Sequence, residues 1–476
     1  METIIGLEIH VELDTKTKIF CNCPTTFGAL PNHHTCPVCM GLPGTLPVLN
    51  QAVVDMAVKA GLALGCEIQT VSKLDRKNYF YPDLPKAYQI SQYDLPICTN
   101  GSVEINVEGQ MKTIRIHRIH IEEDAGKLMH DEHEPYSYID YNRVGVPLIE
   151  IVSEADLRSP VEAVAFLRAV RSILQYAEVS DCRMEQGSMR CDGNISVRPF
   201  GQEALNAKVE LKNINSFKEL QKALEKEEKR QTELYNFGEG HKIVQETRRW
   251  DAAKGRTISM RTKEYAHDYR YFPDPDLKPI LLKEETIRAV KAKLPELPAA
   301  KAARFKETYG LTEKEIAILT GEMALGHFFE AAVEDGAPAK TTANWILGDL
   351  LRYLKENDLE ADAHPIQPAQ LASLIQLVDV GDISGTVGKE VFALMFRTGQ
   401  DPEAIVSEKG LKQISSTSEL ESIVDEVLSQ NKASVTDFQS GKKQALGFLM
   451  GQVMKASGGQ ANPKLAKQLL ESKLQN

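Results

Sequence analysis

The sequence predicts an α+β fold, in which an N-terminal domain with a mixed, largely antiparallel sheet and flanking helices is followed by a part made of helices alone. Two observations indicate this fold class. Up to about residue 293, several segments alternate polar with β-favouring apolar residues, which is typical of a sheet with one covered and one open face. After the proline-containing run at residues 294–298, strand signals nearly vanish and apolar residues recur at helical spacing.

The first strand is predicted at residues 3–13, where the run GLEIHVEL alternates strictly. Alternate side chains on a strand share a face and lie about 6.6 Å apart. Glu8, His10 and Glu12 therefore line one face, and the apolar residues between them enter the core. The remaining strand candidates are residues 103–108, 111–123, 146–152, 190–198, 206–212 and 277–282.

Helices are predicted from capping signals. Ser159 followed by Pro160 marks the start of one helix, and Ser216 caps another. In the helical part, Thr312 and Glu315 have the spacing of a capping box, and a further helix starts near residue 342. We therefore predict three domains, at residues 1–293, 294–405 and 406–476.

Composition narrows the class of protein. The chain has 476 residues and a formal net charge of −11, which argues against a surface that coats nucleic acid throughout. From residue 441 onward six lysines stand against one acid, which predicts either a local contact with a polyanion or a solvated helix face. The sequence shows no basic-then-apolar leader and no stretch of about 18 apolar residues, so we expect a cytoplasmic protein.

Four of the eight cysteines are clustered near the N-terminus. The pair Cys21 and Cys23 is separated by twelve residues from the pair Cys36 and Cys39, and paired thiolates of this kind can close a tetrahedral zinc site. Four protein ligands leave no open coordination position. We therefore predict a structural zinc knuckle within residues 21–39, with a purely supporting role.

Two other interpretations of this cluster stay open at this point. One is a redox Cys-x-x-Cys, which here lacks the usual βαβ context, and the other replaces one cysteine ligand by His33 or His34. The other cysteines are scattered, and in a cytoplasmic protein we expect them to be buried and unreactive. They are Cys66, Cys98, Cys182 and Cys191.

Carboxylates recur on the open faces of other predicted strands. Glu150 interrupts the apolar run PLIEIV and must face a cleft or a cation, because burying it unpaired costs several kcal/mol. Asp192 and Glu210 lie on strands that alternate in the same way, and residues 119–127 end a strand in three consecutive acids. Each strand alone fits a solvated sheet face. Together they gather carboxylates whose repulsion favours bound Mg²⁺, with His10 as a further ligand or a proton shuttle.

Two loops combine basic and aromatic residues near prolines, at residues 75–83 and 85–88. Such loops can hold a phosphate or stack a base, and they can equally be packed loops with buried tyrosine rings. The sequence contains neither a Gly-x-x-x-x-Gly-Lys-Ser/Thr loop nor a Gly-x-Gly-x-x-Gly fingerprint. The residues alone therefore do not predict ATP binding.

In their order along the whole chain, these motifs resemble those of the B subunits of bacterial aspartyl/glutamyl-tRNA(Asn/Gln) amidotransferases. So many long motifs in one order are highly specific. The motifs are GLEIHVEL (6–13), DRKNYFYPD (75–83), EEDAGK (122–127), LIEIVSE (148–154), DGNIS (192–196), VELKN (209–213), DYRYFP (268–273), GFLMGQ (447–452) and ANP (461–463).

The resemblance implies a catalytic cradle domain, a helical domain and a small helical tail similar to the YqeY family, which binds tRNA. It implies that the cradle binds the acceptor arm of a misacylated tRNA(Gln) or tRNA(Asn). The γ-phosphate of ATP is then transferred to the side-chain carboxylate of the attached Glu or Asp. Ammonia from the A subunit, a glutaminase, displaces the phosphate, and the C subunit completes the complex. The expected activity is that of an ATP-dependent carbon–nitrogen ligase with glutamine as amido donor.

The resemblance also implies roles for individual residues. Those expected to bind Mg²⁺ and support phosphoryl transfer are Glu8, His10, Glu123, Glu150, Asp192 and Glu210. Lys86 and Glu123 resemble the pair at the mouth of an ammonia tunnel, whereas Glu12 has no implied role and is expected to be a supporting carboxylate. The residues expected to contact phosphate are Lys77, Lys127 and Arg143.

Two other function classes stay open. One is a non-catalytic subunit that docks tRNA, and the other is a free-standing metal-dependent hydrolase. A groove that docks a polyanion should not be lined with Glu, which favours the catalytic class. The sequence leaves open which misacylated tRNA is the substrate and which residues bind adenine.

Overall fold

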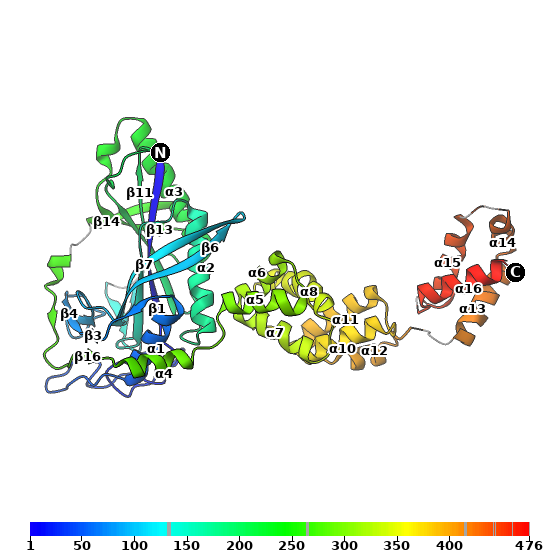
Figure 1. Ribbon diagram of the computed structural model, residues 1–476, viewed down its shortest axis with the longest axis horizontal. Coiled ribbons are helices and arrows are strands. Elements are labelled where there is room, and N and C mark those ends of the chain that lie inside the picture. Colours follow the sequence, from blue (N-terminus) through cyan, green and yellow to red (C-terminus); the bar gives the residue numbers. More distant parts are fainter. Residues whose placement is uncertain are drawn as a thin grey trace. The chain divides into compact units, whose positions relative to one another are not determined.

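The chain divides into two compact units, Met1–Ala300 and Lys301–Asn476, in a computed structural model of the protein (Figure 1). The structure describes all residues except 131–134, 263–265, 414–416, 441, 443, 459 and 476. Lys443, one of the six lysines of the predicted basic segment, is therefore outside the described residues.

A nine-stranded sheet forms the framework of the first unit and confirms the predicted fold class. Its strand order is β14-β13-β12-β11-β1-β10-β7-β6-β2, and all neighbours are antiparallel except β12 and β13. In that order the strands are Arg256–Thr262, Glu246–Asp251, Val209–Lys212, Met189–Arg198, Glu2–Glu12, Pro147–Ser153, Gln110–Glu123, Cys98–Val107 and Glu67–Ile68.

The observed strands differ from the predicted ones at several places, and β2 and most of the short strands of the smaller sheets described below were not predicted. Of residues 277–282 only β16 (Ile280–Leu281) pairs, with β3 (Val71–Ser72) in a separate two-stranded sheet. The preceding Pro279 has no N–H to donate, which limits this strand. Strands β13 and β14 were not predicted, because charged residues in their sequences hide the alternation.

Three helices pack against one face of the large sheet: α1 (Gln51–Ala63), α2 (Pro160–Tyr176) and α3 (Phe217–Asn236) (Figure 1). The apolar side chains of β1 share one buried core with these helices. Ser159 and Ser216 cap α2 and α3 as predicted, each accepting a hydrogen bond of 3.2 Å from a backbone N–H. The helices therefore cover the apolar face of the sheet and leave the polar face to the site.

Smaller elements complete the first unit. A three-stranded sheet has the order β15-β4-β5, and its β5 runs beside the end of β7. The bounds are Phe272–Pro273 (β15), Asp75–Asn78 (β4), Tyr88–Ser91 (β5), Lys127–His130 (β8), Ser137–Asp140 (β9), Gly240–Lys242 (η1), Ala266–Tyr269 (η2) and Glu284–Ala292 (α4). Strands β8 and β9 pair with each other.

The second unit is built from helices, which have two separate hydrophobic clusters at residues 305–406 and 420–474. The predicted capping box of Thr312 and Glu315 is present, and the helix predicted from about residue 342 begins at Ala339. The bounds are Pro298–Tyr309 (α5), Glu313–Gly321 (α6), Met323–Glu334 (α7), Ala339–Trp345 (α8), Ile346–Leu350 (η3, a π-helix), Leu351–Glu356 (α9), Pro368–Asp379 (α10), Gly385–Thr398 (α11), Pro402–Glu408 (α12), Thr417–Gln430 (α13), Lys432–Gln439 (α14), Gln444–Ala456 (α15) and Pro463–Gln475 (α16).

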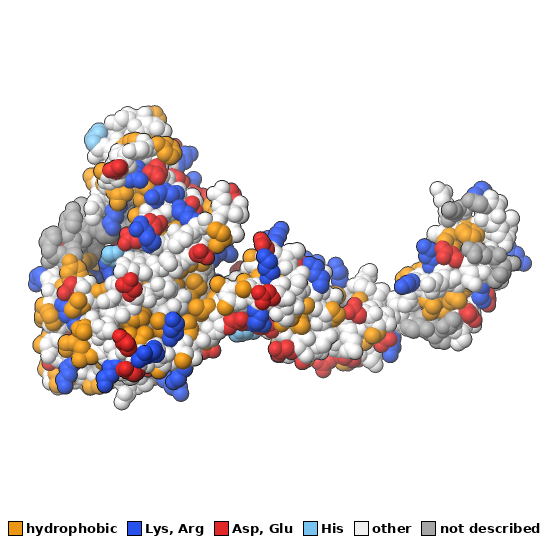
Figure 2. Space-filling view, viewed as in Figure 1, with side chains coloured by type: hydrophobic (Ala, Val, Ile, Leu, Met, Phe, Trp, Pro, Cys, Tyr) orange, Lys and Arg blue, Asp and Glu red, His pale blue; other side chains and the backbone are white. Residues whose placement is uncertain are grey.

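The surface carries charges of both signs. On the face shown in Figure 2, acidic and basic side chains are interspersed over both units. Among the described residues no single helix has both the length and the apolar character needed to cross a membrane. Helices α6 and α7 reach that length and composition only as a pair, which bends by 113° at its break.

Candidate active site and metal centre

Strand β1 lies in the middle of the large sheet, and its register brings polar residues of neighbouring strands together. Glu8 lies opposite Asp192 on β11, and His10 lies opposite Glu150 on β10. Glu150 is in turn opposite His120 on β7. Cross-strand partners share a face, so these side chains form one polar surface on the face that the three helices leave open.

One group on this surface consists of three carboxylates, Glu8, Asp192 and Glu210, which offer oxygen atoms within 4.8 Å of one another. Lys212 balances their charge, with its Nζ atom 2.6 Å from Asp192 and 3.5 Å from Glu210. The side-chain amide of Asn194 donates a hydrogen bond of 2.9 Å to Glu8. Three carboxylate oxygens at this spacing fit a hard cation such as Mg²⁺.

A second group consists of His10, Glu122 and Glu150, whose candidate ligand atoms also lie within 4.8 Å of one another. Nε2 of His10 is 3.5 Å from an oxygen of each carboxylate. His120 approaches from β7, with Nε2 3.1 Å from Glu150 and 3.7 Å from Glu122. Its Nδ1 atom is buried without a hydrogen-bond partner. This group offers both imidazole and carboxylate ligands.

The charges of the second group stabilise one another. Burial opposes ionisation of Glu150, but His120 and His10 outweigh it and hold its pKa well below the usual range. Burial likewise opposes protonation of both histidines. The carboxylates outweigh this effect, raising the pKa of His120 to about 9 and that of His10 above its ordinary value. Without a bound cation, the protonated form of His120 is therefore favoured around neutral pH, and the carboxylates shift His10 in the same direction.

Glu123 lies outside both groups of candidate ligands. Its neighbour Glu122 points toward His10, so strand alternation turns Glu123 to the other face. There Glu123 forms an ion pair with Lys86 and accepts a hydrogen bond of 2.8 Å from the backbone N–H of Ile90. The structure thus brings Glu123 together with Lys86. It places Glu123 apart from the other residues that were predicted to bind Mg²⁺.

Arg143 lies at the edge of the polar surface. Its Nη2 atom is 2.8 Å from Glu12 and 2.6 Å from Asp124, which also pairs with Arg190 at 2.8 Å. Burial and the charge of Asp124 raise the pKa of Glu12 to about 7, although Arg143 opposes the shift. Arg143 therefore organises a carboxylate pair beside the second group.

Lys77 and Lys127, the other predicted phosphate contacts, lie on different small strands. Lys77 on β4 places its Nζ atom 4.8 Å from the ring centre of Tyr269, whereas Lys127 begins β8 and is exposed. The β4 region also carries Tyr79, whose ring meets that of Tyr269 edge-on at 6.0 Å. Burial raises the pKa of Tyr79, and nearby carboxylates including Glu122 add to the shift. The Tyr79 ring is therefore packed near the acidic surface, whereas Phe80 and Tyr81 of the same loop are exposed.

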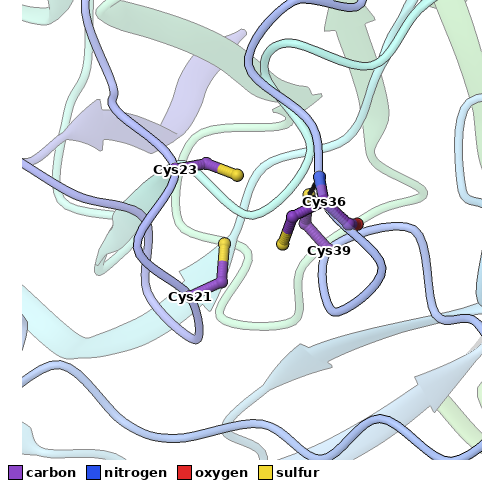
Figure 3. A group of neighbouring side chains, drawn as sticks. All are labelled: Cys21, Cys23, Cys36 and Cys39. Carbon is purple, nitrogen blue, oxygen red and sulfur yellow. Dashed lines mark hydrogen bonds between the residues drawn. The ribbon is translucent and has the colours of Figure 1, made fainter.

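The four clustered cysteines meet at one place, as predicted from their spacing. Their Sγ atoms lie within 4.8 Å of one another, and Figure 3 shows the sulfur atoms of the two pairs turned toward each other. A hydrogen bond from the Cys21 thiol lowers the pKa of Cys39 to about 5. The backbone N–H of Cys36 donates to the same sulfur at 3.1 Å. Four converging sulfurs, one already favoured as thiolate, fit a tetrahedral zinc ion.

The sequence interpretation missed three residues of this surface. Glu122 and His120 were not assigned to the metal-binding set. On a strand these two residues share one face, and Glu123 lies on the opposite face. That alternation was the available signal. Lys212 alternates with the apolar residues of its strand, but only the register with Asp192 reveals its role as counter-ion.

Comparisons with known proteins agree along the whole chain. The sequence model of the GatB/GatE catalytic domain matches residues 3–288, and that of the GatB domain matches residues 327–474. An aspartyl/glutamyl-tRNA(Asn/Gln) amidotransferase B subunit of Clostridium acetobutylicum, numbered 2 in that organism, is 60% identical over 473 residues, covering 99% of each chain. The corresponding B subunits of Clostridium beijerinckii and Carboxydothermus hydrogenoformans are 61% and 55% identical, each over 99% of this chain and over 99% and 98% of their own lengths.

Proposed function

This chain belongs to the family of aspartyl/glutamyl-tRNA(Asn/Gln) amidotransferase B subunits, and from that premise we propose that it converts Glu or Asp attached to tRNA into Gln or Asn. The complete enzyme is then a glutamine-hydrolysing, ATP-dependent carbon–nitrogen ligase. The A subunit supplies ammonia by glutamine hydrolysis, the C subunit completes the complex, and the misacylated tRNA is the substrate. Such an enzyme works in protein biosynthesis in the cytoplasm.

The observation that carries the phosphoryl-transfer step is the pair of ligand groups that share strand β1. Glu8 contributes to one group and His10 to the other, and alternate residues of a strand lie about 6.6 Å apart. Bound Mg²⁺ would neutralise the charge that develops on the transferred phosphoryl group of ATP. Asp192 and Glu210 complete the first group, and Glu150 completes the second together with Glu122.

The chain's other charged groups fit roles around this surface. Arg143, held by Glu12 and Asp124, lies where it can orient a phosphate at the edge of the second group. Lys77 and Lys127 are the further candidates for phosphate contacts. In our proposal the Lys86–Glu123 pair admits ammonia to the activated carboxylate from the opposite face of β7. The helical tail of residues 406–476, with its lysines, would bind tRNA.

A non-catalytic docking role within the same complex is the alternative. A tRNA-binding groove needs positive potential, whereas the open face of this sheet gathers two groups of carboxylates around a few cations. The alternative predicts that the carboxylates could be neutralised without loss of chemistry, and that tRNA would then bind more tightly.

The test is reconstitution of this chain with the A and C subunits, followed by assay of amidation on each misacylated tRNA with glutamine and ATP. We expect Glu8→Gln to abolish tRNA-dependent ATP hydrolysis while tRNA affinity stays within about tenfold. The matched control is Glu104→Gln, which neutralises an exposed glutamate on the neighbouring region of the same sheet. Normal ATP turnover in the Glu8 variant would overturn the phosphoryl-transfer assignment, and the docking alternative would replace it.

A further inference from the structure

Lys86 is held in an enclosed position beside the cysteine cluster. Its side chain is 9% exposed and that of its partner Glu123 is 2% exposed. The ammonium group also lies 5.3 Å from the ring centre of Tyr88 and 5.9 Å from that of Phe20. Ordering a lysine side chain costs rotamer entropy, so this position is held only if the residues that enclose Lys86 are themselves well fixed.

Two of the residues that enclose Lys86 belong to the cysteine knuckle, which we define as residues 20–41. Its first arm is the segment 20–23, and its second arm is the segment 36–41. Phe20 immediately precedes Cys21 and packs under the ammonium group of Lys86. Gly41 follows Cys39 by two residues and lies against the stem of the same side chain. A Cβ atom at Gly41 would overlap Cγ of Lys86 and lie 3.4 Å from its Cβ and Cδ atoms. Each arm of the knuckle thus contacts Lys86 next to a predicted zinc ligand.

Backbone hydrogen bonds fix both contacts relative to the sulfurs. In the second arm, the N–H of Met40 donates to the carbonyl of Cys36 and that of Gly41 to the carbonyl of Val38, both at 3.0 Å. Phe20 is joined directly to Cys21, and just before this arm the N–H of Lys18 donates to the carbonyl of Cys23 at 3.0 Å, which closes the loop that carries Phe20 and Cys21. Displacement of either cysteine pair therefore moves the residue of the same arm that contacts Lys86, which is Phe20 in the first arm and Gly41 in the second.

The cysteine cluster and the ion pair also border the same space. A cavity of about 110 Å³ is lined by Cys21 and Cys39 on one side and by Lys86 and Glu123 on the other. Gly145 lies between them, since a Cβ atom there would be 3.7 Å from Cβ of Cys39 and 3.9 Å from a carboxylate oxygen of Glu123. The ion pair is therefore contiguous with the cysteine cluster.

We propose that the metal held by the four cysteines closes the two arms of the knuckle on Lys86 and so positions this residue against Glu123. Gly41 is the positioning residue through which the second arm acts, because any side chain at this position would displace Lys86. The knuckle is then a clamp for the ion pair as well as a fold-stabilising staple. The inference rests on the zinc site that the four cysteines fit and on the role proposed above for the Lys86–Glu123 pair, and it does not depend on phosphoryl transfer.

The first test measures the reactivity of lysine amines in the full-length protein before and after zinc is removed with a chelator. Bound zinc is counted by metal analysis, and labelling by an amine-reactive reagent is read by mass spectrometry. We expect one zinc ion per chain. When the zinc is removed, the labelling rate of Lys86 should rise by about tenfold. Lys59 on α1, with an 18% exposed side chain paired with Glu178, is the internal control and should not change.

The second test leaves the metal in place. Gly41→Ala should expose Lys86 to labelling while zinc content stays at one per chain. The matched control is Gly44→Ala in the same loop. Both glycines have positive φ, +64° and +87°, so both variants carry backbone strain, but a Cβ atom at Gly44 meets nothing within 4 Å. We therefore expect Gly44→Ala to leave Lys86 protected.

Three results would overturn the proposal: a native protein without zinc, protection of Lys86 that survives zinc removal, or an equal rise at Lys59. The last result would show general loosening of the unit and no specific clamp. Equal labelling of Lys86 in the Gly41 and Gly44 variants would remove Gly41 as the positioning residue. Labelling is independent of amidation activity, so failure of the clamp is distinguishable from failure of the proposed enzymatic function.

Discussion

The two ligand groups on the open face of the sheet differ in how their negative charge is balanced. Around Glu8, Asp192 and Glu210 the balancing group is the ammonium of Lys212. Around Glu122 and Glu150 the balancing groups are two imidazoles. The two groups share strand β1 and a similar ligand spacing, but they differ in this counter-ion and in the imidazole that the second group adds to its carboxylate ligands.

One group therefore has a fixed counter-charge, and the other has a titratable one. Burial opposes the charge of Lys212, but Asp192 and Glu210 outweigh it and raise its pKa, so it stays charged throughout the physiological range. His120 has a pKa of about 9 and can release its proton when a cation takes over the balancing role. Cation binding should therefore depend on pH at the histidine group and much less at the carboxylate group.

The largest expected effect tests whether both groups serve the same reaction. Asp192→Asn and Glu150→Gln should each lower tRNA-dependent ATP hydrolysis by about 100-fold or more, which corresponds to about 2.7 kcal/mol of transition-state stabilisation. The measurement is steady-state ATP turnover in the reconstituted complex. A loss in only one variant would show that only one group takes part in phosphoryl transfer.

The next effect tests the titratable counter-charge in metal-free protein. The folded-state pKa of His120, about 9, lies above the value of about 6.5 expected in the unfolded chain. Its stabilisation is therefore complete below about pH 6.5 and is lost as pH rises through about 9. His120→Gln should lower the free energy of unfolding by about 3 kcal/mol at pH 6. That cost should shrink steadily toward pH 9.5, as measured by urea denaturation.

A cost that is the same at pH 6 and pH 9.5 would show that His120 contributes by packing alone. In that case the carboxylates would not depend on the histidine charge, and the contrast between the two groups would disappear.

The smallest effect concerns the fixed counter-charge. Lys212→Met should cost about 1 kcal/mol in the metal-free protein, because the Lys212 side chain is 39% exposed and solvent screens much of the interaction. Since the raised pKa of Lys212 keeps it charged, this cost should be constant between pH 6 and pH 9.5. Millimolar Mg²⁺ should restore the lost stability by binding the three carboxylates. Failure of Mg²⁺ to do so would argue against a cation site there.

Much of this surface follows from local sequence patterns. Strict alternation placed Glu8 and His10 on one face, and the apolar strand around Glu150 required a cleft or a cation. The spacing of the two cysteine pairs predicted that their sulfur atoms lie close together, because both pairs lie in one short loop region. The caps at Ser159 and Ser216 located two of the covering helices. These features depend on neighbours along the chain.

Other features depend on register and were beyond local reasoning. Alternation separates Glu122 from Glu123, but which of the two faces of β7 joins His10 is set by the register of β7 with β10. The division into two ligand groups follows from the strand order, which no single strand reveals. The contact of Gly41 with Lys86 joins two loops that are separated by 45 positions in the printed sequence. Long-range pairings of this kind are fixed by tertiary packing.

In our proposal, the open face of the sheet binds two cations at ligand groups of different chemistry. Counting bound Mn²⁺ by electron paramagnetic resonance tests it most directly, because Mn²⁺ accepts both carboxylate and imidazole ligands. We predict two ions per chain, with one lost in Asp192→Asn and the other in Glu150→Gln. Only the ion that remains in Asp192→Asn should weaken as pH falls from 8 to 6. Unchanged Mn²⁺ binding in both variants would contradict the account.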